Sequence, residues 1–173
     1  MKPVFLATAL ALLATPALAD TKTAKVSLID ETGAKAEIGT VTFADSATGL
    51  KIETKLTGLS PGRHGFHIHE NGDCGPASKD GKQIAGGAAG GHYDPKKTGK
   101  HMGPESSAGH AGDLPVLVAD DQGRSEQIIS APRLKTADVA NRSIMIHEGG
   151  DNYADEPEPL GGGKGRIACG VIK

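Results

Sequence analysis

The chain has no tryptophan and only 3% aromatic residues, so its core must be built from valine, isoleucine, leucine and alanine. Its net charge of −2 gives no basic excess of the kind that a nucleic-acid-binding face requires. Beyond residue 20, no segment is long and apolar enough to span a membrane as a helix. In contrast, 25 glycines and 10 prolines favour turns and long loops over a helical bundle.

The N-terminal residues have the three parts of a secretory signal peptide. Lys2 supplies a positive charge, residues 4–13 form an apolar stretch too short to cross a bilayer, and Ala17-Leu18-Ala19 is a small-residue cleavage site. A membrane anchor or a buried N-terminal helix is the alternative. We predict cleavage that separates a signal peptide at residues 1–19 from one domain at residues 20–173.

Cysteine is scarce, with only Cys74 and Cys169 present. In an exported protein two cysteines favour one disulfide. This bridge would close a loop of about 95 residues, which the chain-entropy argument values at about 4–5 kcal/mol at most. Two unpaired thiols, or a pair of soft copper ligands, are the alternatives.

Alternation of apolar and polar residues predicts strands along most of the chain. In residues 50–56, Leu50, Ile52 and Leu56 alternate with charged residues, which is the pattern of a half-buried strand. Further strands are expected at residues 25–28, 40–43, 63–70, 116–118, 126–129, 143–147 and 166–172, with hairpin turns at 30–33 and 45–49 and a short helical turn at 136–140. About eight short strands predict an all-β antiparallel sandwich or barrel.

Two long segments interrupt this alternation, at residues 71–114 and 148–165. Structureless segments of such length inside one domain are usually functional or disordered. The first is rich in glycine, proline, lysine and aspartate, and it carries Cys74, His92, His101, His110 and Asp113. These side chains favour a functional loop that is tied to the scaffold.

Six of the seven histidines form a pattern typical of a metal centre: His67, His69, His92, His101, His110 and His147. His67 and His69 are two apart on a predicted strand, so their side chains share one face. His64 points to the opposite face with Phe66 and Ile68, where we expect a structural histidine in the core.

His147 ends a second predicted strand, so two strands offer three imidazoles to one side and the loop brings a fourth. Four imidazoles suit copper, whereas three imidazoles and one carboxylate suit tetrahedral zinc. Six histidines and Asp113 cannot fill two four-coordinate sites unless one ligand is shared. The count therefore favours a bridging imidazole, without saying which histidine it is.

Four motifs, in this order, resemble the copper–zinc superoxide dismutase family over nearly the whole chain after the signal peptide. They are His64-Gly65-Phe66-His67-Ile68-His69-Glu70, Gly90-Gly91-His92-Tyr93-Asp94-Pro95, Gly109-His110-Ala111-Gly112-Asp113-Leu114-Pro115 and Gly165-Arg166-Ile167-Ala168-Cys169-Gly170-Val171-Ile172.

The resemblance implies an eight-stranded antiparallel Greek-key β-barrel with two long functional loops. It implies one copper per chain, bound by His67, His69, His92 and His147. It also implies one zinc per chain, bound by His92, His101, His110 and Asp113, with His92 as the bridge.

Four further roles follow from the same resemblance. Arg166 overlooks the copper as a catalytic residue that anchors the anionic substrate, and His92 is the second catalytic residue because a bridging imidazole can take up a proton. Asp151 connects the two sites by hydrogen bonds to ligand imidazoles. Cys74 pairs with Cys169.

Residues 149–153 and 156–160, together with an extra segment at about residues 75–89, resemble the bacterial periplasmic branch of that family. The implied location is the periplasm. A homodimer stays open, because dimers of that branch commonly have an aromatic residue, often tryptophan, at their interface.

The implied function is the dismutation of superoxide to dioxygen and hydrogen peroxide as an antioxidant defence outside the cytoplasm. Superoxide is the expected partner, with no nucleic acid and no membrane after signal cleavage. Lys79, Lys82 and Lys164 are candidates for steering this anion, or are simply solvated lysines. A dinuclear zinc hydrolase would want more carboxylates, and a copper carrier would want more soft sulfur.

Overall fold

The computed structural model describes residues 21–173, and the expected signal peptide at residues 1–19 lies outside the described residues. Strands dominate the described part of the chain, together with one short α-helix and two 3₁₀ turns. The elements are β1 (Thr21–Asp30), β2 (Gly33–Ser46), β3 (Gly49–Leu56), β4 (Gly62–His64), β5 (Phe66–His69), β6 (Ala77–Lys79), β7 (Lys82–Ile84), η1 (Gly87–Ala89), β8 (Leu117–Ala119), β9 (Ile128–Ala131), α1 (Thr136–Val139), β10 (Ser143–His147), η2 (Pro159–Gly162) and β11 (Arg166–Val171).

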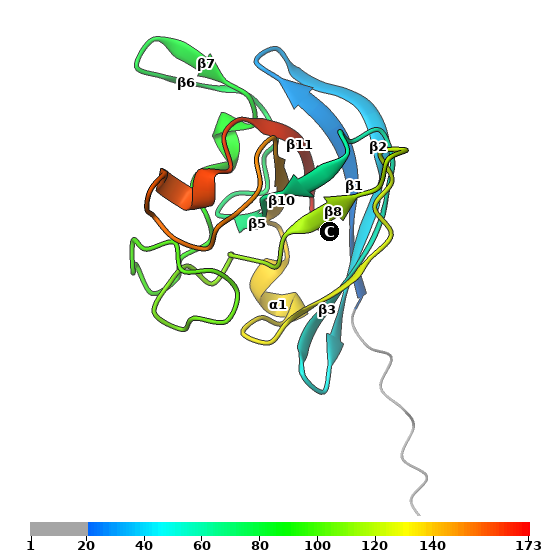
Figure 1. The fold of residues 1–173 in the computed structure, drawn as a ribbon, viewed down its shortest axis with the longest axis vertical. Coiled ribbons are helices and arrows are strands. Elements are labelled where there is room, and N and C mark those ends of the chain that lie inside the picture. Colours follow the sequence, from blue (N-terminus) through cyan, green and yellow to red (C-terminus); the bar gives the residue numbers. More distant parts are fainter. Residues whose placement is uncertain (1–20) are drawn as a thin grey trace, which may run out of the picture.

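The strands form a curled antiparallel sheet (Figure 1). Seven strands pair in the order β5-β10-β11-β1-β2-β3-β9, while β4 pairs with β8. Consecutive strands are not always neighbours, since β3 pairs with β9 and β5 pairs with β10. Such crossing connections are typical of a Greek-key barrel. The all-β barrel expected from the sequence is therefore confirmed.

The predicted alternation is confirmed in the core. Leu50, Ile52 and Leu56 on β3 are at most 1% exposed, and Phe43 and Phe66 are fully buried. The two expected hairpins connect β1 to β2 and β2 to β3. An aliphatic core with very few aromatic rings is thus sufficient to fill this barrel.

The expected strand at residues 63–70 is divided in two at Gly65. The N–H of Gly65 donates to the carbonyl of Gly149 (2.7 Å), and its own carbonyl accepts from the N–H of His147 (2.9 Å). These bonds connect the strand to the second long loop and to the end of β10. When β4 and β5 are counted as one strand and the β6–β7 hairpin is set aside, eight barrel strands remain.

The expectation that residues 71–114 contain no strands was wrong at one place, the β6–β7 hairpin. Asp80 and Gly81 form its turn with φ values of 51° and 78°. An Asp-Gly pair with two positive φ angles matches the twist of a two-residue hairpin, so the local signal was present. The hairpin projects from the barrel (upper left in Figure 1).

Strand β9 begins two residues later than the expected strand at residues 126–129. The preceding residues bond to β3 irregularly: the N–H of Thr54 donates to the carbonyl of Gln127 (2.9 Å), and that of Leu56 donates to Ser125 (3.0 Å). The side-chain hydroxyl of Thr54 also accepts from the N–H of Gln127 (3.0 Å). A side chain therefore replaces part of the regular ladder there.

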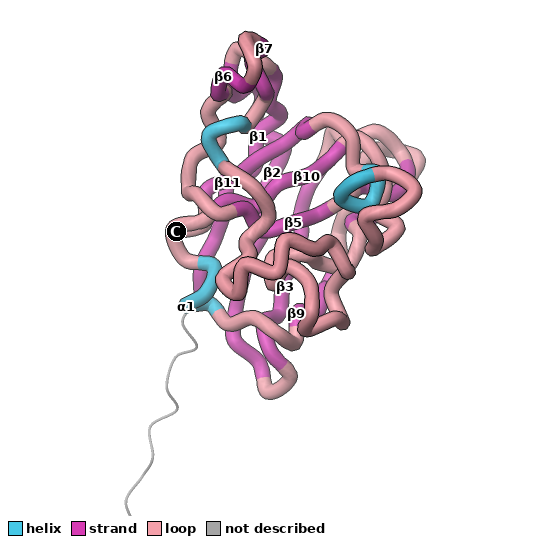
Figure 2. The backbone as a smooth tube through the Cα atoms, turned by 90° about the vertical axis from the view of Figure 1, so that its left-hand side faces the viewer, coloured by secondary structure: helices cyan, strands magenta, loops and turns pink. Residues whose placement is uncertain are grey.

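The long loops gather on one side of the barrel, at the left in Figure 1 and toward the viewer in Figure 2. Within residues 21–173 no helix has the length and apolar character that crossing a membrane requires. The expected disulfide is confirmed, since Cys74 is bonded to Cys169 of β11. It fixes the start of the first loop to the barrel.

Removing the disulfide should lower the free energy of unfolding. Its two cysteines are 95 residues apart in the chain, and a loop of that length corresponds to about 4–5 kcal/mol at most. We expect the double variant Cys74→Ser/Cys169→Ser to unfold at lower urea concentration than the parent, with the chemically reduced parent as the control. An unchanged unfolding midpoint would contradict this account.

Candidate metal centre

His67 and His69 lie on β5 and are fully buried on the same side of the strand. His64 is also buried, but it belongs to none of the clusters of potential metal ligands in the described residues. Its Nδ1 lies 2.7 Å from the carbonyl oxygen of His147, and its Nε2 lies 2.8 Å from that of Ser60. His64 thus connects two backbone segments, as its expected structural role requires.

The two strands and the first loop bring four imidazoles together. His147 ends β10, which pairs directly with β5, and His92 forms an isolated bridge with His69. One ring nitrogen from each of His67, His69, His92 and His147 lies within 4.8 Å of the others. We call these four residues the strand group.

A second cluster lies beside the first and shares one residue with it. It consists of His92, His101, His110 and Asp113, whose candidate ligand atoms also lie within 4.8 Å of one another. We call these four residues the loop group. His92 is a member of both groups. Its Nδ1 lies 3.0 Å from Oδ1 of Asp113, and its Nε2 lies on the opposite edge of the ring, away from that contact.

Strand β5 holds the first loop in place through the backbone of one residue. The N–H of Ile68 donates to Gly112 (2.9 Å), and its carbonyl accepts from Tyr93 (2.8 Å). Gly112 and Tyr93 are bonded to each other as well (2.8 Å). These bonds fix the backbone next to His92 and Asp113, which explains how a loop can present ligands at defined positions.

Buried ring nitrogens without a hydrogen-bond partner test whether these residues fit metal ions. Among the described residues, the buried side-chain atoms that lack a partner are mostly imidazole nitrogens: His67 Nδ1, His69 Nε2, His92 Nε2, His101 Nδ1, His110 Nδ1, and both nitrogens of His147. Leaving a buried polar group unpaired costs about 1–3 kcal/mol each, so such a concentration needs an explanation. Coordination of metal ions supplies one.

The opposite nitrogens of four of these rings are hydrogen-bonded, that of His92 to Asp113. His67 Nε2 and His101 Nε2 each lie 2.7 Å from a carboxylate oxygen of Asp151, and His69 Nδ1 lies 3.0 Å from the carbonyl of Gly90. Such partners fix the tautomer and orientation of a metal-ligating imidazole. The residues present therefore fit two metal ions with His92 between them.

Asp113 is the point on which the loop group converges. Its Oδ1 lies 3.0 Å from His92 Nδ1, 3.1 Å from His101 Nδ1 and 3.4 Å from His110 Nδ1. The two longer contacts bring nitrogens that lack proper hydrogen-bond geometry close to one anionic oxygen. Four candidate ligand atoms this close to one another could hold one cation.

Burial keeps most of the rings neutral in the metal-free protein. It lowers the pKa of His69 and His147 well below the usual value and that of His92 to about 3. Burial also acts on His101, but the nearby carboxylates of Asp113 and Asp151 outweigh it and raise the pKa of His101 to about 9. A metal must displace that proton, since only neutral imidazole is a ligand.

Asp151 links the two groups, because one of its oxygens faces His67 and the other faces His101. The N–H of Tyr153 also donates to Oδ1 (2.7 Å). Gly161 lies so close above this carboxylate, with a φ of 71°, that a Cβ atom would collide with it. Sequence reasoning assigned no role to Gly161, because only the folded loop brings it over Asp151.

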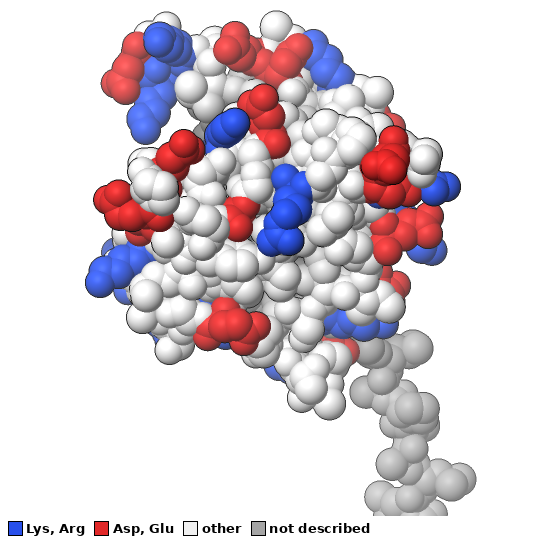
Figure 3. All heavy atoms as spheres, in the orientation of Figure 1, with Lys and Arg blue, Asp and Glu red and all other residues white. Residues whose placement is uncertain are grey.

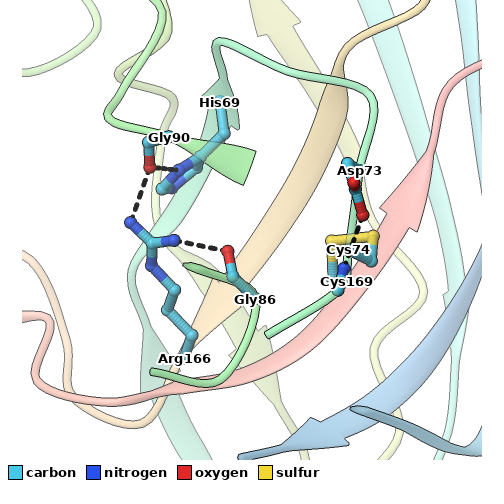
Figure 4. Close-up of a disulfide and its surroundings, with 8 residues drawn as sticks. His69, Asp73, Cys74, Gly86, Gly90, Arg166 and Cys169 are labelled. Atoms are coloured by element: carbon cyan, nitrogen blue, oxygen red, sulfur yellow. Dashed lines mark hydrogen bonds between the residues drawn. A yellow bond between two sulfur atoms is a disulfide. The ribbon is translucent and has the colours of Figure 1, made fainter. Parts of the chain in front are cut away.

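Arg166 begins β11 opposite His147, and backbone carbonyls hold its guanidinium (Figure 4). Nη1 donates to Gly86 (2.6 Å) and Nη2 donates to Gly90 (2.7 Å). Gly90 is also the acceptor for His69, so one peptide group contacts both a candidate ligand and this arginine. The guanidinium keeps further N–H donors for an anion.

Two surface cavities lie beside this region. One, of about 380 Å³, is lined by His147 and Lys164 among others. Another, of about 490 Å³, is lined by Arg166, Glu148 and Ile84 of the hairpin among others. Of the strand group, His147 therefore borders a cavity at the surface.

A Greek-key barrel with two four-ligand groups that share an imidazole defines a dinuclear metalloprotein. The chain matches the copper/zinc superoxide dismutase family model over residues 37–172. It is 49% identical to a Cu-Zn superoxide dismutase of Brucella abortus and 51% identical to one of Salmonella typhimurium, with 100% of each chain covered.

Solved structures agree with this match. The Cu/Zn superoxide dismutase from Brucella abortus superposes with a TM-score of 0.87 at 49% identity, covering 89% of this chain and 100% of that one. The monomeric enzyme from Salmonella enterica gives 0.79 at 52% identity, with the same coverage. The chain belongs to the copper/zinc superoxide dismutase family. It is an oxidoreductase that dismutes superoxide with copper and zinc as cofactors.

The metal-free protein should lose stability as pH falls from about 6.5 to about 3. In this window unfolded His92 takes up a proton, whereas the folded ring has a pKa of about 3 and does not. Each buried ring with a lowered pKa reduces the free energy of unfolding by about 1.4 kcal/mol for every unit by which the pH falls within this window. His101, with its raised pKa, is protonated in both states within this window, and its stabilisation is lost as pH rises from about 6.5 through about 9.

Urea unfolding of the metal-free protein at about pH 7.5, 5.5 and 4.5 measures this dependence. His92→Gln should reduce the slope by roughly one proton. Equal or greater stability at the lowest pH would show that the rings are not held neutral by burial.

Proposed function

We propose that the strand group (His67, His69, His92 and His147) binds copper and that the loop group (His92, His101, His110 and Asp113) binds zinc. One observation carries this assignment: each of the six rings has a buried nitrogen without a hydrogen-bond partner and belongs to a group whose candidate ligand atoms lie within 4.8 Å of one another. The donor types support it too, because four imidazoles suit copper and a set with one carboxylate suits zinc.

Bound copper supplies a one-electron donor and acceptor, while zinc is redox-inert and organises its ligands. The chain's own residues supply binding and proton positions. Arg166 is permanently charged and half-buried, it lies opposite His147 in the β10–β11 pair, and it lines the neighbouring cavity of about 490 Å³, where its multiple donors attract a small anion. Arg166 is therefore the proposed anchor for superoxide.

His92 is the proposed second catalytic residue. Its Nδ1 faces Asp113, whereas its Nε2 is buried without a partner on the side of the strand group. A proton on Nε2 would leave the Nδ1 side of the ring unchanged. The ring is thus suited to hold one of the two protons that dismutation consumes.

Positive charges that attract superoxide must lie close to the cavity beside His147. Acidic and basic side chains are interspersed on the face seen in Figure 3, without a broad positive area. Lys164 lines the cavity beside His147, while Lys79 and Lys82 are exposed on the β6–β7 hairpin. We assign the larger steering effect to Lys164, because a charge acts most strongly within a Debye length of about 8 Å.

The proposed place of action is the periplasm, where an antioxidant role is consistent with the disulfide. The signal-peptide features of residues 1–19 and the bacterial sources of its relatives support this proposal. A homodimer has less support, because the Salmonella enterica relative is described as monomeric and this chain has no tryptophan.

The two metals should separate by mutation. Because His147 belongs only to the strand group, His147→Ala should lose copper and activity while it retains most of its zinc. Asp113→Ala should weaken zinc first, because Asp113 belongs only to the loop group. Metal analysis of the purified variants, together with a superoxide assay, measures both effects. Equal loss of both metals in both variants would refute the assignment.

Activity should fall in the order Arg166, Lys, Ile, Glu at this position, with both metals bound throughout. Lysine keeps one charge but loses the planar fork, isoleucine removes the charge, and glutamate inverts it. Salt should slow the parent because screening weakens attraction of the anion. A fully metallated Arg166→Glu enzyme with the parent's rate would refute this role.

A further inference from the structure

Arg133 contacts the loop that carries two of the proposed zinc ligands. It lies in the connection between β9 and α1, next to Leu134, whose buried side chain fixes the backbone to the core. The Arg133 guanidinium bonds to a segment that lies at least 23 residues earlier in the chain. Nε donates to the carbonyl of Pro104 (2.7 Å), and Nη2 donates to those of Gly103 (3.1 Å) and His110 (2.8 Å).

These three acceptors come from both ends of the segment at residues 103–110. One end lies two residues after His101, and the other is the carbonyl of His110 itself. Within residues 21–173, no backbone N–H is bonded to any of these three carbonyls. The N–H of His110 also donates to the carbonyl of Lys100 (2.9 Å), so a backbone bond brings the same two ends together. Arg133 adds three bonds to this closure and satisfies the carbonyls of three buried residues.

Three hydrogen bonds from Arg133 hold this side of the loop. A cavity of about 180 Å³ lies beside these bonds, and its lining includes Arg133, Leu134, Gly109, Ala111 and Tyr93. Loss of the guanidinium would remove three hydrogen bonds from the segment beside this cavity.

Charge adds to this arrangement. The positive charge of Arg133 is attracted by Asp113, and Asp113 Oδ2 also accepts from the N–H of Met102 (3.2 Å). Asp113 thus holds the backbone just before the segment, at Met102, and Arg133 holds the two ends of the segment itself. A lysine ammonium would keep the charge, but it has no planar fork to reach three carbonyls at two ends of a loop.

We propose that Arg133 is a positioning residue for the zinc site: by fixing residues 103–110 it holds His101 and His110 toward Asp113 and thereby sets zinc affinity. This inference rests on the proposed zinc assignment of the loop group. Arg133 itself contacts no proposed ligand atom, so its effect passes through the loop backbone.

Zinc competition with a chelator tests the proposal on purified Arg133→Gln, Arg133→Lys and Arg124→Gln. Arg124 is the matched control, since it is exposed and bonds only to Asp120 and Gln122. We expect the zinc dissociation constant of Arg133→Gln to rise about 10- to 100-fold, as for other partners that orient ligands. Arg133→Lys should be intermediate, and Arg124→Gln should stay within about twofold of the parent.

Copper affinity and a spectroscopic signature separate positioning from general destabilisation. Copper binding should change by less than about twofold in Arg133→Gln, while Co²⁺ placed in the loop group should show altered visible absorption. Parent-like zinc affinity, or an equal weakening of zinc and copper, would overturn the proposal. If Arg133→Gln does not fold, Arg133→Lys decides by the same criteria.

Asp113→Ala distinguishes the two ways of failing. If Asp113→Ala loses zinc but Arg133→Gln does not, only the role of Arg133 is wrong. If Asp113→Ala binds zinc as the parent does, the zinc assignment itself is wrong.

Discussion

Both halves of the metal centre depend on the hydrogen bonds of one carboxylate, that of Asp151. It accepts from Nε2 of His67 and from Nε2 of His101, and so it selects the tautomer in which each ring leaves Nδ1 free for its group. A single side chain therefore fixes the orientation of one candidate ligand on a strand and of another in a loop. In the metal-free protein the same carboxylate keeps a cluster of buried rings from being wholly unsatisfied, which limits the cost of preforming the site.

Backbone groups complete what Asp151 begins. The β5 peptide at Ile68 bonds to two segments of the first loop, so the ligand residues next to those bonds inherit the rigidity of the barrel. Gly161 then allows the second loop to cover Asp151 closely. The centre is a barrel site completed by loops, which is why both a regular sheet and long irregular segments are needed.

Local patterns in the sequence were enough to predict the barrel class, the shared face of His67 and His69, and the core position of His64. Each depends on the two-residue period of a strand, which holds wherever one face is buried. The division at Gly65, the late start of β9 and the contacts of Gly161 and Arg133 depend on partners far away in the chain. No local propensity contains that information. The β6–β7 hairpin is different, because its Asp80-Gly81 turn was visible but lay within a segment classed as loop by its composition.

The β6–β7 hairpin is fixed at its base and exposed at its tip. Cys74 secures one side through the disulfide, and Gly86 secures the other through Arg166, while Asp80 and Gly81 at the turn are exposed. The distance between the two ends of this segment is therefore set by the barrel and not by the hairpin itself. Residues inserted at the turn would extend outward without moving either end, which makes this the place where the chain can accommodate additional length or a grafted peptide.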